Sequence, residues 1–371
     1  MGTPSDVVIV GAGVMGCAVA FELARRGVAA TVLERSVPGA EASSAAAGML
    51  GAQVESHAPG PLVDLCVASR ARFGGWAGAL REATGIDVEH RVCGVTKVAF
   101  DIAELDAMEE HASWQRAAGL RADTLRASDV RAREPEIAGE VIGGVSFPDE
   151  ARVDPPRFLK ALRIAAERAG ATFRTGAIVR RLHVEGDRCS GVELEAGDTL
   201  AAAHVVLAAG SWSTLVGGAP LAPDAVRPAR GQIVELLLPA PIQRGMVLGA
   251  KAYLSPRDDG RVLIGSTLEF VGFDRGVTAG AVRDLLAAAT RLIPRLERAD
   301  LGRAWSSFRP YTQNELPLIG ASGVERLSLA TGHFRNGILL SPITAEIVAS
   351  RIVGTAPPID PAPFAAPRAR A

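Results

Sequence analysis

Three glycines near the start of the sequence have the spacing GxGxxG, in the run Gly11-Ala12-Gly13-Val14-Met15-Gly16. A β-branched run, Val7–Val10, precedes them, and a helical pattern follows from about residue 14 to residue 26. In such a strand–turn–helix unit, Gly11 permits the sharp turn, Gly13 lets backbone amides approach a pyrophosphate, and Gly16 lets the helix pack on the sheet. The helix N-terminus offers N–H groups and a positive dipole end to phosphate. The pattern therefore predicts a phosphate-binding turn.

An acidic residue follows at the distance that a dinucleotide site requires. Glu34 closes the second predicted strand, and its carboxylate can accept both hydroxyls of a ribose while repelling the 2′-phosphate of NADP. A turn without a ligand is the alternative, but the strand, the helix and the acid together favour a dinucleotide. The fingerprint occurs once, whereas a flavoprotein reduced by NAD(P)H commonly carries a second copy. These residues by themselves leave FAD and NAD open.

Further segments carry a resemblance to a known family: Glu41–Leu50, Ala209–Ser213, Phe308–Thr312 with Leu316–Gly320, and Gly332–Leu340. Together with the glycine-rich turn, they resemble the D-amino-acid oxidase superfamily of FAD-dependent enzymes, and within it the glycine oxidases of thiamine biosynthesis. The resemblance runs from about residue 6 to residue 354 and is most specific over residues 333–340. It implies FAD, and non-covalent FAD, because none of the four cysteines lies beyond Cys189 in the segments where covalent members tether the flavin.

The resemblance also implies which residues hold FAD. Val14 and Met15 would lie against the pyrophosphate, and Glu34 and Arg35 at the adenosine. The other residues assigned to the cofactor are Gly11, Gly13, Gly16, Ala42, Ser43, Ser44, Ala47, Gly48, Met49, Val179, Gly210, Trp212, His333, Phe334, Arg335, Asn336, Gly337, Ile338 and Leu339. Family members often have a hydroxyl at the position of Ala42, so that contact is expected to be lost or to move to Ser44. Judged on its residues alone, the run from 43 to 49 is a helix start buried for packing.

An arginine and a tyrosine are the expected substrate ligands. Oxidation of an α-amino acid needs few catalytic groups, since the protein mainly has to orient the substrate against the cofactor. Arg309 matches the family's carboxylate-binding arginine, and a planar guanidinium suits bidentate binding of a carboxylate. Tyr253 matches the tyrosine that also touches the carboxylate, and Arg335 is expected at the carboxylate or at the flavin. The alternatives are a surface ion pair for Arg309 and ordinary strand packing for Tyr253. His333 is expected to pack and hydrogen-bond rather than to act as a base.

The expected activity is FAD-dependent oxidation of glycine or an N-substituted glycine, a sarcosine-like secondary amine. Hydride transfer to flavin N5 would give an imine, and reoxidation by O₂ would give H₂O₂ and glyoxylate. The alternatives are a D-amino-acid oxidase, a flavin dehydrogenase that uses another acceptor, and a catalytically silent FAD-binding subunit. Lys251 and Leu268 depart from the histidine and methionine of the glycine oxidases. Leu268, with Phe270 and Phe273, is expected to face the nitrogen substituent.

The periodic patterns predict two domains, of α/β plus α+β class. A Rossmann-type FAD-binding domain is assembled from three segments, residues 1–83, 148–222 and 301–356. The inserted residues 84–147 and 223–300 form a substrate-binding domain on a mixed β-sheet. Helices are expected at about 61–85, after Asp154 as N-cap until Gly170, from Val282 to before Pro294, and after Ser341 as N-cap with Pro342 next. Five prolines among the last fifteen residues predict a flexible tail over 357–371.

The composition excludes several classes of protein. The chain has 371 residues, 48% of them hydrophobic and 22% charged, and its formal net charge of −1 provides no basic field for nucleic acid or anionic lipid. The four cysteines have no CxxC spacing, which excludes a zinc ribbon and suits a reducing cytoplasm. The uncharged run Val7–Phe21 is too short to span a bilayer and lacks the basic residues that precede a signal-peptide core. We expect a cytoplasmic enzyme without a metal, nucleic-acid or membrane partner, and the resemblance implies a homotetramer.

Overall fold

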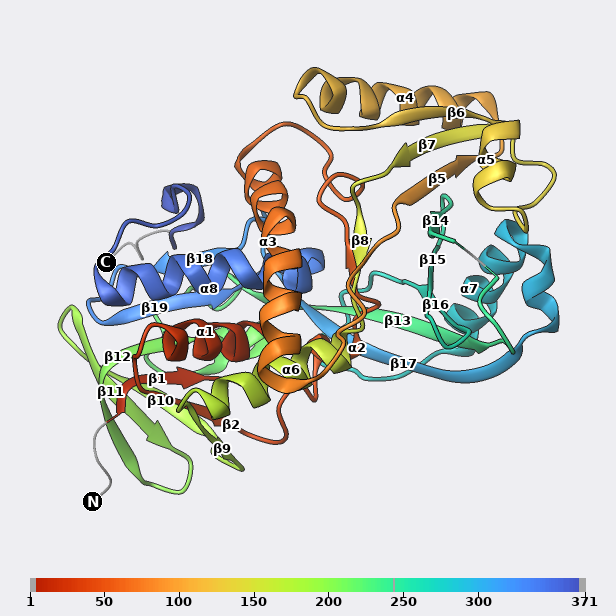
Figure 1. The fold of residues 1–371 in the computed structure, drawn as a ribbon. Helices are drawn as coiled ribbons and strands as arrows, with labels where there is room; N and C mark the ends of the chain where they lie inside the picture. Colours follow the sequence, from red (N-terminus) through yellow and green to blue (C-terminus); the bar gives the residue numbers. More distant parts are fainter. Residues whose placement is uncertain (1–4, 243, 367–371) are drawn as a thin grey trace.

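The structure is a computed structural model that describes residues 5–242 and 244–366. In these residues two eight-stranded sheets are accompanied by a small sheet of three strands, β3 (Met49–Leu50), β8 (Ala151–Arg152) and β4 (Arg91–Val92). Figure 1 shows the first large sheet with α1 and α8 on one side of the molecule and the second sheet on the other, and β8 between them. The predicted fold class, α/β plus α+β, is confirmed.

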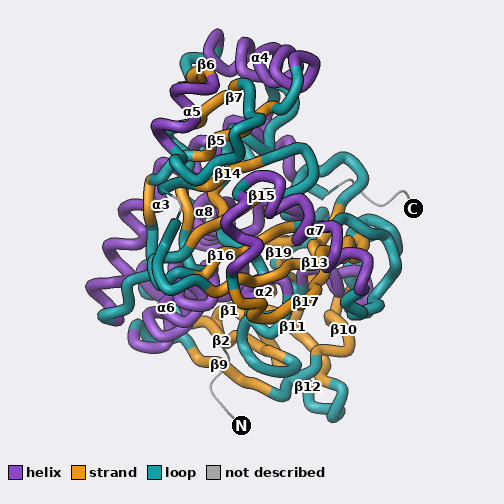
Figure 2. Tube along the Cα trace, turned by 90° about the vertical axis from the view of Figure 1, so that its right-hand side faces the viewer, coloured by secondary structure: helices purple, strands orange, loops and turns teal. Residues whose placement is uncertain are grey.

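The first sheet is the Rossmann-type unit. Its strands follow the order β10–β11–β12–β1–β2–β9, with β19 beside β12 and β18 beside β19, and the pairs that join β19, β12, β1, β2 and β9 are parallel. The strands are β1 (Ser5–Val10), β2 (Ala30–Glu34), β9 (Thr172–Thr175), β10 (Val179–Glu185), β11 (Arg188–Leu194), β12 (Thr199–Leu207), β18 (Leu318–Ala321) and β19 (Leu327–Thr331). The helices that accompany it are α1 (Val14–Arg25), α3 (Pro61–Thr84), α6 (Pro155–Arg168) and α8 (Gly337–Val353), and Figure 2 shows α3 and α6 along one flank.

The central strand β1 is covered on both faces. Val7 and Ile9 belong to the apolar cluster that includes α1, α6 and α8, whereas Val8 and Val10 belong to a cluster with β10, β11 and β12. Alternate side chains of a strand point to opposite faces, so an uninterrupted β-branched run indicates burial on both. The predicted buried strand is confirmed, and it places the glycine-rich turn directly at its end.

The second sheet lies in the region that is predicted to be the substrate-binding domain. Its order is β17–β13–β16–β15–β14–β5–β7–β6, and it is mixed because β14 and β5 are parallel while the other pairs are antiparallel. Its strands are β5 (Val95–Ala99), β6 (Asp123–Arg126), β7 (Gly143–Phe147), β13 (Arg227–Leu237), β14 (Met246–Leu248), β15 (Tyr253–Pro256), β16 (Arg261–Gly265) and β17 (Asp300–Tyr311). Helices α4 (Ile102–Ala117), α5 (Ala127–Arg133) and α7 (Ala279–Leu292) pack beside it.

Strand β17 corrects the predicted domain boundary at residue 301. It pairs with β13 from Arg227↔Tyr311 to Leu237↔Asp300, and therefore completes the second sheet rather than the first. The two strands are long enough to run from the second domain back to the first (Figure 1). Because Arg309 lies on β17, the substrate candidate belongs to the inserted domain's sheet and is carried to the junction by that strand.

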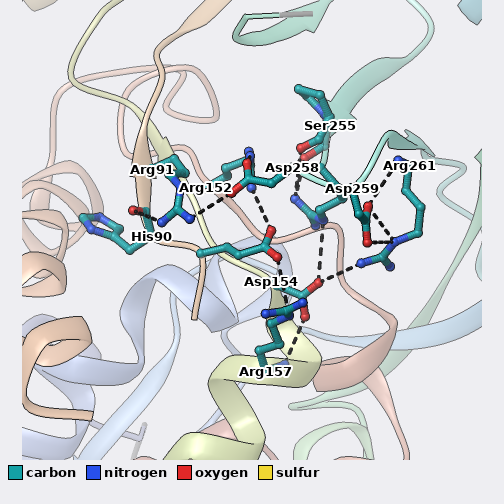
Figure 3. A network of polar contacts seen from close by, with 12 residues as sticks. His90, Arg91, Arg152, Asp154, Arg157, Ser255, Asp258, Asp259 and Arg261 are labelled. Carbon is teal, nitrogen blue, oxygen red and sulfur yellow. Dashed lines mark hydrogen bonds and ion pairs between the residues drawn. The ribbon is translucent and has the colours of Figure 1, made fainter. Parts of the chain in front are cut away.

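A network of ion pairs joins the domains near β8 and α6 (Figure 3). Arg152 of β8 pairs with Asp258, in the turn between β15 and β16, and Arg91 of β4 reaches the same carboxylate at 2.8 Å. Asp154, at the start of α6, pairs with Arg261 of β16 at 3.4 Å. Partly buried networks hold geometry better than isolated surface pairs do. The network therefore fixes the β15–β16 hairpin, which carries Tyr253, against the FAD-binding domain.

The helix boundaries test the capping predictions. Asp154 accepts a hydrogen bond from the Arg157 amide at 3.0 Å, so its predicted role as N-cap of α6 is confirmed. The predicted N-cap at Ser341 is wrong, because α8 begins at Gly337 and contains Pro342. Proline cannot donate to the carbonyl of Ile338 four residues earlier, and the Ser341 hydroxyl donates to that carbonyl instead, at 2.9 Å. The serine–proline pair therefore lies inside the helix, where the serine hydroxyl replaces the hydrogen-bond donor that proline lacks.

One stretch of the described residues, Phe334–Val353, is long and apolar enough to cross a membrane by length and composition. The sequence analysis did not single it out. Within the structure 67% of its most apolar window is buried, and α8 packs against α1 and α3. A helix that is apolar all round is explained by such a core position.

The described part of the predicted tail differs from the expectation of flexibility. A short 3₁₀ turn, Ala362–Phe364, packs near β18, and the Phe364 side chain is buried in the same apolar cluster as α8. The buried aromatic ring and a hydrogen bond from the Ala366 amide to the carbonyl of Ala321, at 3.3 Å, dock this proline-rich segment, which its composition predicts to be loose. Residues 367–371 of the predicted tail lie outside the described residues.

Candidate active site

The parallel strands of the first sheet end at one edge, and their ends line a cavity of about 400 Å³. Val10 ends β1, Glu34 ends β2, Thr331 ends β19, and Ala208 follows β12; all four line this cavity. Ligands of parallel α/β sheets bind outside the carboxyl ends of the strands. The predicted dinucleotide site therefore lies where the fold can bind a ligand.

The glycine-rich turn has the tight geometry that its sequence predicts. Gly11 has φ +100°, and a Cβ atom there would lie 2.7 Å from the carbonyl oxygen of Ala208. A Cβ atom at Gly16 would lie 1.9 Å from the carbonyl oxygen of Gly11, so α1 can pack on the turn only with glycine there. Gly13, the N-cap of α1, supplies no side-chain cap, and the Val14 amide donates to the Ser43 hydroxyl at 2.8 Å. The first turn of α1 thus faces the cavity with its positive dipole end.

The backbone fixes Glu34 at the end of the cavity where an adenosine is predicted to bind. Its carboxylate accepts hydrogen bonds from the amides of Ala12, at 2.8 Å, and Ser36, at 2.9 Å. Beside it the Arg35 guanidinium lies 3.9 Å from the ring centroid of Trp212, a cation–π contact that presents both side chains to the cavity. A fixed carboxylate and a flat aromatic–guanidinium surface suit a ribose and an adenine.

Side chains of the second domain hold the small-residue segment that follows Ser43. The Trp305 indole donates to the carbonyl of Ala45 at 3.0 Å. The buried Arg257 guanidinium and the Ser255 hydroxyl both donate to the carbonyl of Ala47. Burial lowers the pKa of Arg257 to about 10, so it stays a cation at neutral pH. Arg257 and Trp305 escaped the sequence analysis, because nothing in their local pattern indicates a partner more than 200 residues away.

Arg309 and Tyr253 line the other end of the same cavity. Both depend on glycines of neighbouring strands for room. A Cβ atom at Gly231 would lie 2.3 Å from the Arg309 Nη1 atom, and a Cβ atom at Gly265 would lie 2.2 Å from the Tyr253 hydroxyl. Arg309 donates to the Ser266 hydroxyl and to the carbonyl of Thr267, at 3.1 Å. The guanidinium is therefore oriented by neutral acceptors, and its remaining donors stay available.

Arg309 has no carboxylate partner within the described ranges, 5–242 and 244–366, whereas most arginines there form ion pairs. Burial in the cavity, and then the nearby Arg335, lower the pKa of Arg309, while Tyr253 and Glu55 oppose this shift. Burial also raises the pKa of Tyr253, so its hydroxyl stays a neutral donor at physiological pH. A partly buried cation beside a neutral donor is an arrangement that an anionic ligand completes.

Arg335 also lines the cavity, and it lies beside the carboxylate of Glu55. Its Nε atom lies 3.8 Å from Glu55 Oε2, and the Glu55 side chain is 18% exposed. Glu55 lines the cavity from the turn between β3 and α3. The sequence analysis missed this residue, because nothing in its local pattern points to Arg335, 280 positions away.

Most of the predicted site residues come together in this one cavity. Its lining includes Gly11, Gly13, Val14, Met15, Glu34, Arg35, Ala42, Ser43, Ala47, Gly48, Met49, Val179, Gly210, Trp212, Tyr253, Arg309, His333, Phe334, Arg335, Asn336, Gly337 and Ile338. Gly16, Ser44 and Leu339 are not part of the lining. Gly16 serves packing, and the Ser44 hydroxyl lies near Gly39 rather than replacing the missing hydroxyl at Ala42. Leu339 is buried in the core, where its carbonyl accepts from Ser69.

The apolar residues expected at the nitrogen substituent lie elsewhere. Phe273 stacks on Trp212, with ring centroids 4.9 Å apart, which places it at the adenosine end. Phe270 packs edge-on against Tyr311 at 5.0 Å, and Leu268 is exposed. Lys251 is exposed as well, and none of these residues lines the cavity. The expectation fails because the loop after β16 turns along the outside of the molecule.

His333 is buried in the loop before α8 and hydrogen-bonds to the Thr344 hydroxyl through Nε2, at 3.0 Å. Burial lowers the pKa of His333 to about 3, so the ring is neutral at physiological pH. A neutral ring with this partner fits the expected packing role.

This pKa predicts a pH dependence of stability. Because His333 titrates near 6.5 in the unfolded chain and near 3 in the folded one, the unfolded state binds more protons between these values. The folded state should lose about 1.4 kcal/mol per pH unit as pH falls below 6.5, or about 2 kcal/mol at pH 5. Urea unfolding of the FAD-loaded protein at pH 7.5 and pH 5 measures this loss. His333→Gln should show a drop smaller by about that amount, and equal drops in the two proteins would contradict the assignment.

The fold and the cavity define a class of protein, a dinucleotide-dependent oxidoreductase with a cationic site for a small anion beside the cofactor. The family of FAD dependent oxidoreductases known as DAO matches residues 6–351, and the chain belongs to this family. The residues fit FAD: a turn with no room for a Cβ atom at Gly11 or Gly16, a carboxylate fixed by two amides, and one continuous cavity from Trp212 to Arg309.

Several characterised proteins are similar over nearly the whole chain. Glycine oxidase of Geobacillus kaustophilus is 38% identical over 98% of this chain and 97% of its own length. Its crystal structure superposes with a TM-score of 0.94 over 100% of both chains. The bifunctional protein ThiO/ThiG of Synechocystis is 36% identical over 95% of this chain, which spans 52% of that relative. Iminodiacetate oxidase of Chelativorans sp. BNC1 has a TM-score of 0.88 at 26% identity, over 97% of this chain and 98% of its own.

Proposed function

We propose that this protein oxidises the Cα–N bond of glycine or an N-substituted glycine, with glyoxylate, ammonia or the freed amine, and H₂O₂ as products. The observation that supports it most is Arg309, a cation without a carboxylate partner in the described residues, beside the neutral Tyr253 hydroxyl. The similarity to glycine oxidases supports the same substrate class. When bound, FAD supplies the hydride acceptor for this oxidation.

The side chains of this site orient the substrate and set its protonation state. Arg309 binds the carboxylate through two hydrogen bonds, and the Tyr253 hydroxyl donates a third. The positive charge of Arg309 disfavours the ammonium form of the substrate, and the neutral amine is the form that can be oxidised. No side chain has to act as a base in this scheme, in keeping with the lowered pKa of His333, which makes its ring a weak base.

An N-substituted glycine remains part of the proposal, but residues other than Leu268, Phe270 and Phe273 would contact its nitrogen substituent. The apolar side chains that line the cavity include Ile233 of β13 and Met49 of β3. Each buried CH₂ is worth ~0.8 kcal/mol, or roughly fourfold in affinity. Sarcosine and N-ethylglycine are therefore expected to compete with glycine. The homotetramer and the cytoplasmic location stay predictions.

A peroxide assay on the purified protein tests the function. Glycine, sarcosine and N-ethylglycine should each produce H₂O₂, with the N-alkyl glycines at least as good as glycine in kcat/KM. D-Alanine and D-proline, which carry their bulk on Cα, should be poorer. Faster turnover of the D-amino acids would make the protein a D-amino-acid oxidase. Reduction of FAD by sarcosine without O₂ consumption on admission of air would make it a dehydrogenase.

A further inference from the structure

We propose that Glu55 restricts the substrate to a single carboxylate by neutralising Arg335, so that glycines with a second acidic group on nitrogen are rejected. This inference rests on the proposed function, and it names the class of nitrogen substituent that the site accepts. Such substituents are neutral, and N-carboxymethylglycine (iminodiacetate) is excluded.

The charges at the substrate end of the cavity carry the argument. Two guanidiniums, those of Arg309 and Arg335, line this cavity, and the charge of Arg335 helps to lower the pKa of Arg309. A dicarboxylate would match such a pair, with one carboxylate on each cation. Glu55 changes this balance, because its carboxylate lines the same cavity and contacts Arg335 at 3.8 Å.

The two arginines differ in their partners. Arg309 is held by the hydroxyl of Ser266 and the carbonyl of Thr267, which leave its charge uncompensated. Arg335 has a carboxylate instead, and in the described part of the chain Glu55 forms no other ion pair or hydrogen bond. One cation is therefore free for a substrate carboxylate, while the other is already matched.

A second carboxylate in this cavity would meet Glu55 as a like charge. Like charges brought together in a binding site lower affinity and exclude wrong partners. A neutral N-methyl or N-ethyl group meets no such repulsion. The same carboxylate thus leaves monocarboxylates unaffected and disfavours dicarboxylates.

Two ethers that cannot be oxidised as amines separate binding from turnover. Methoxyacetate copies sarcosine, and diglycolate copies iminodiacetate, with an ether oxygen in place of the N–H group. Their dissociation constants are measured from the perturbation of the flavin absorbance spectrum of the FAD-loaded protein. The wild type should bind methoxyacetate more tightly than diglycolate.

Glu55→Gln keeps the size of the side chain and removes its charge. It should tighten diglycolate about tenfold relative to methoxyacetate, and this gain should shrink at high salt because it is electrostatic. The double variant Glu55→Gln, Arg335→Gln should lose the gain, since the second carboxylate then has no cation. Glu346→Gln, whose carboxylate pairs with Arg72 outside the cavity, should keep the wild-type ratio.

The outcomes distinguish this proposal from the function on which it rests. An unchanged ratio in Glu55→Gln, or equal weakening of both ethers, would overturn the role of Glu55 while leaving the binding of monocarboxylates intact. A wild type that binds neither ether would instead remove the carboxylate site at Arg309, and both proposals would fail. Turnover should follow binding, with kcat/KM for iminodiacetate rising against N-ethylglycine in Glu55→Gln.

Discussion

Replacing Arg309 with alanine is expected to raise the KM for sarcosine or glycine by roughly 30-fold to several thousand-fold, the equivalent of ~2–5 kcal/mol. The variant loses two charge-assisted hydrogen bonds to the carboxylate, in a cavity whose partial burial already lowers the pKa of this guanidinium. The amount of bound FAD should stay that of the wild type, because Arg309 lies at the far end of the cavity from Glu34, which is predicted to bind the adenosine. Steady-state kinetics by peroxide release measure the effect.

Two further measurements make this prediction specific. Arg309→Lys keeps the charge without the planar fork, so its KM should fall between those of the wild type and the alanine variant. The thermal midpoint of Arg309→Ala should not fall below that of the wild type, because removing a partly buried cation without a carboxylate partner relieves a desolvation cost. A variant that saturates like the wild type would take Arg309 out of the substrate site. A large loss of stability would make its role structural.

Glu34→Ala is expected to weaken FAD binding by about a hundredfold or more. The variant loses the two hydrogen bonds that the ribose hydroxyls would donate to the charged carboxylate, which together are worth ~3 kcal/mol. The amides of Ala12 and Ser36 would lose their acceptor, and the turn that approaches the pyrophosphate would lose its brace. The bound fraction of FAD after gel filtration, and the return of FAD fluorescence on dilution, measure the loss. Glu34→Gln keeps one acceptor oxygen and should retain more cofactor than the alanine variant.

A separate measurement tests whether FAD is attached covalently. Cys17, Cys66, Cys93 and Cys189 do not line the cavity, and His333, which does, directs Nε2 to Thr344. Acid precipitation of the wild type should therefore release all FAD into the supernatant. Yellow colour that stays with the precipitate would show a covalent bond. An unchanged FAD affinity in Glu34→Ala would remove the carboxylate from the adenosine site.

Short-range patterns predicted the nucleotide-binding half well. The turn at residues 11–16, the doubly covered β1 and the Asp154 cap each depend on residues within a few positions of one another, so the sequence expresses their geometry directly. The Ser341 cap failed for a local reason too. A serine before a proline resembles a helix start, and only the position of Gly337 shows that the pair lies within the helix.

The amino-acid sequence by itself determined the strand–turn–helix unit and its acidic partner Glu34, and the family resemblance predicted the roles proposed for Arg309 and Tyr253. The tertiary structure decided which distant groups meet. Three contacts join residues that are 61 to 280 positions apart in the sequence. They are the ion pair between Glu55 and Arg335, the hydrogen bond from Arg257 to the carbonyl of Ala47, and the stacking of Phe273 on Trp212. Local spacing cannot encode such contacts, because they arise only when two sheets are packed against each other and strands such as β17 cross from one domain to the other.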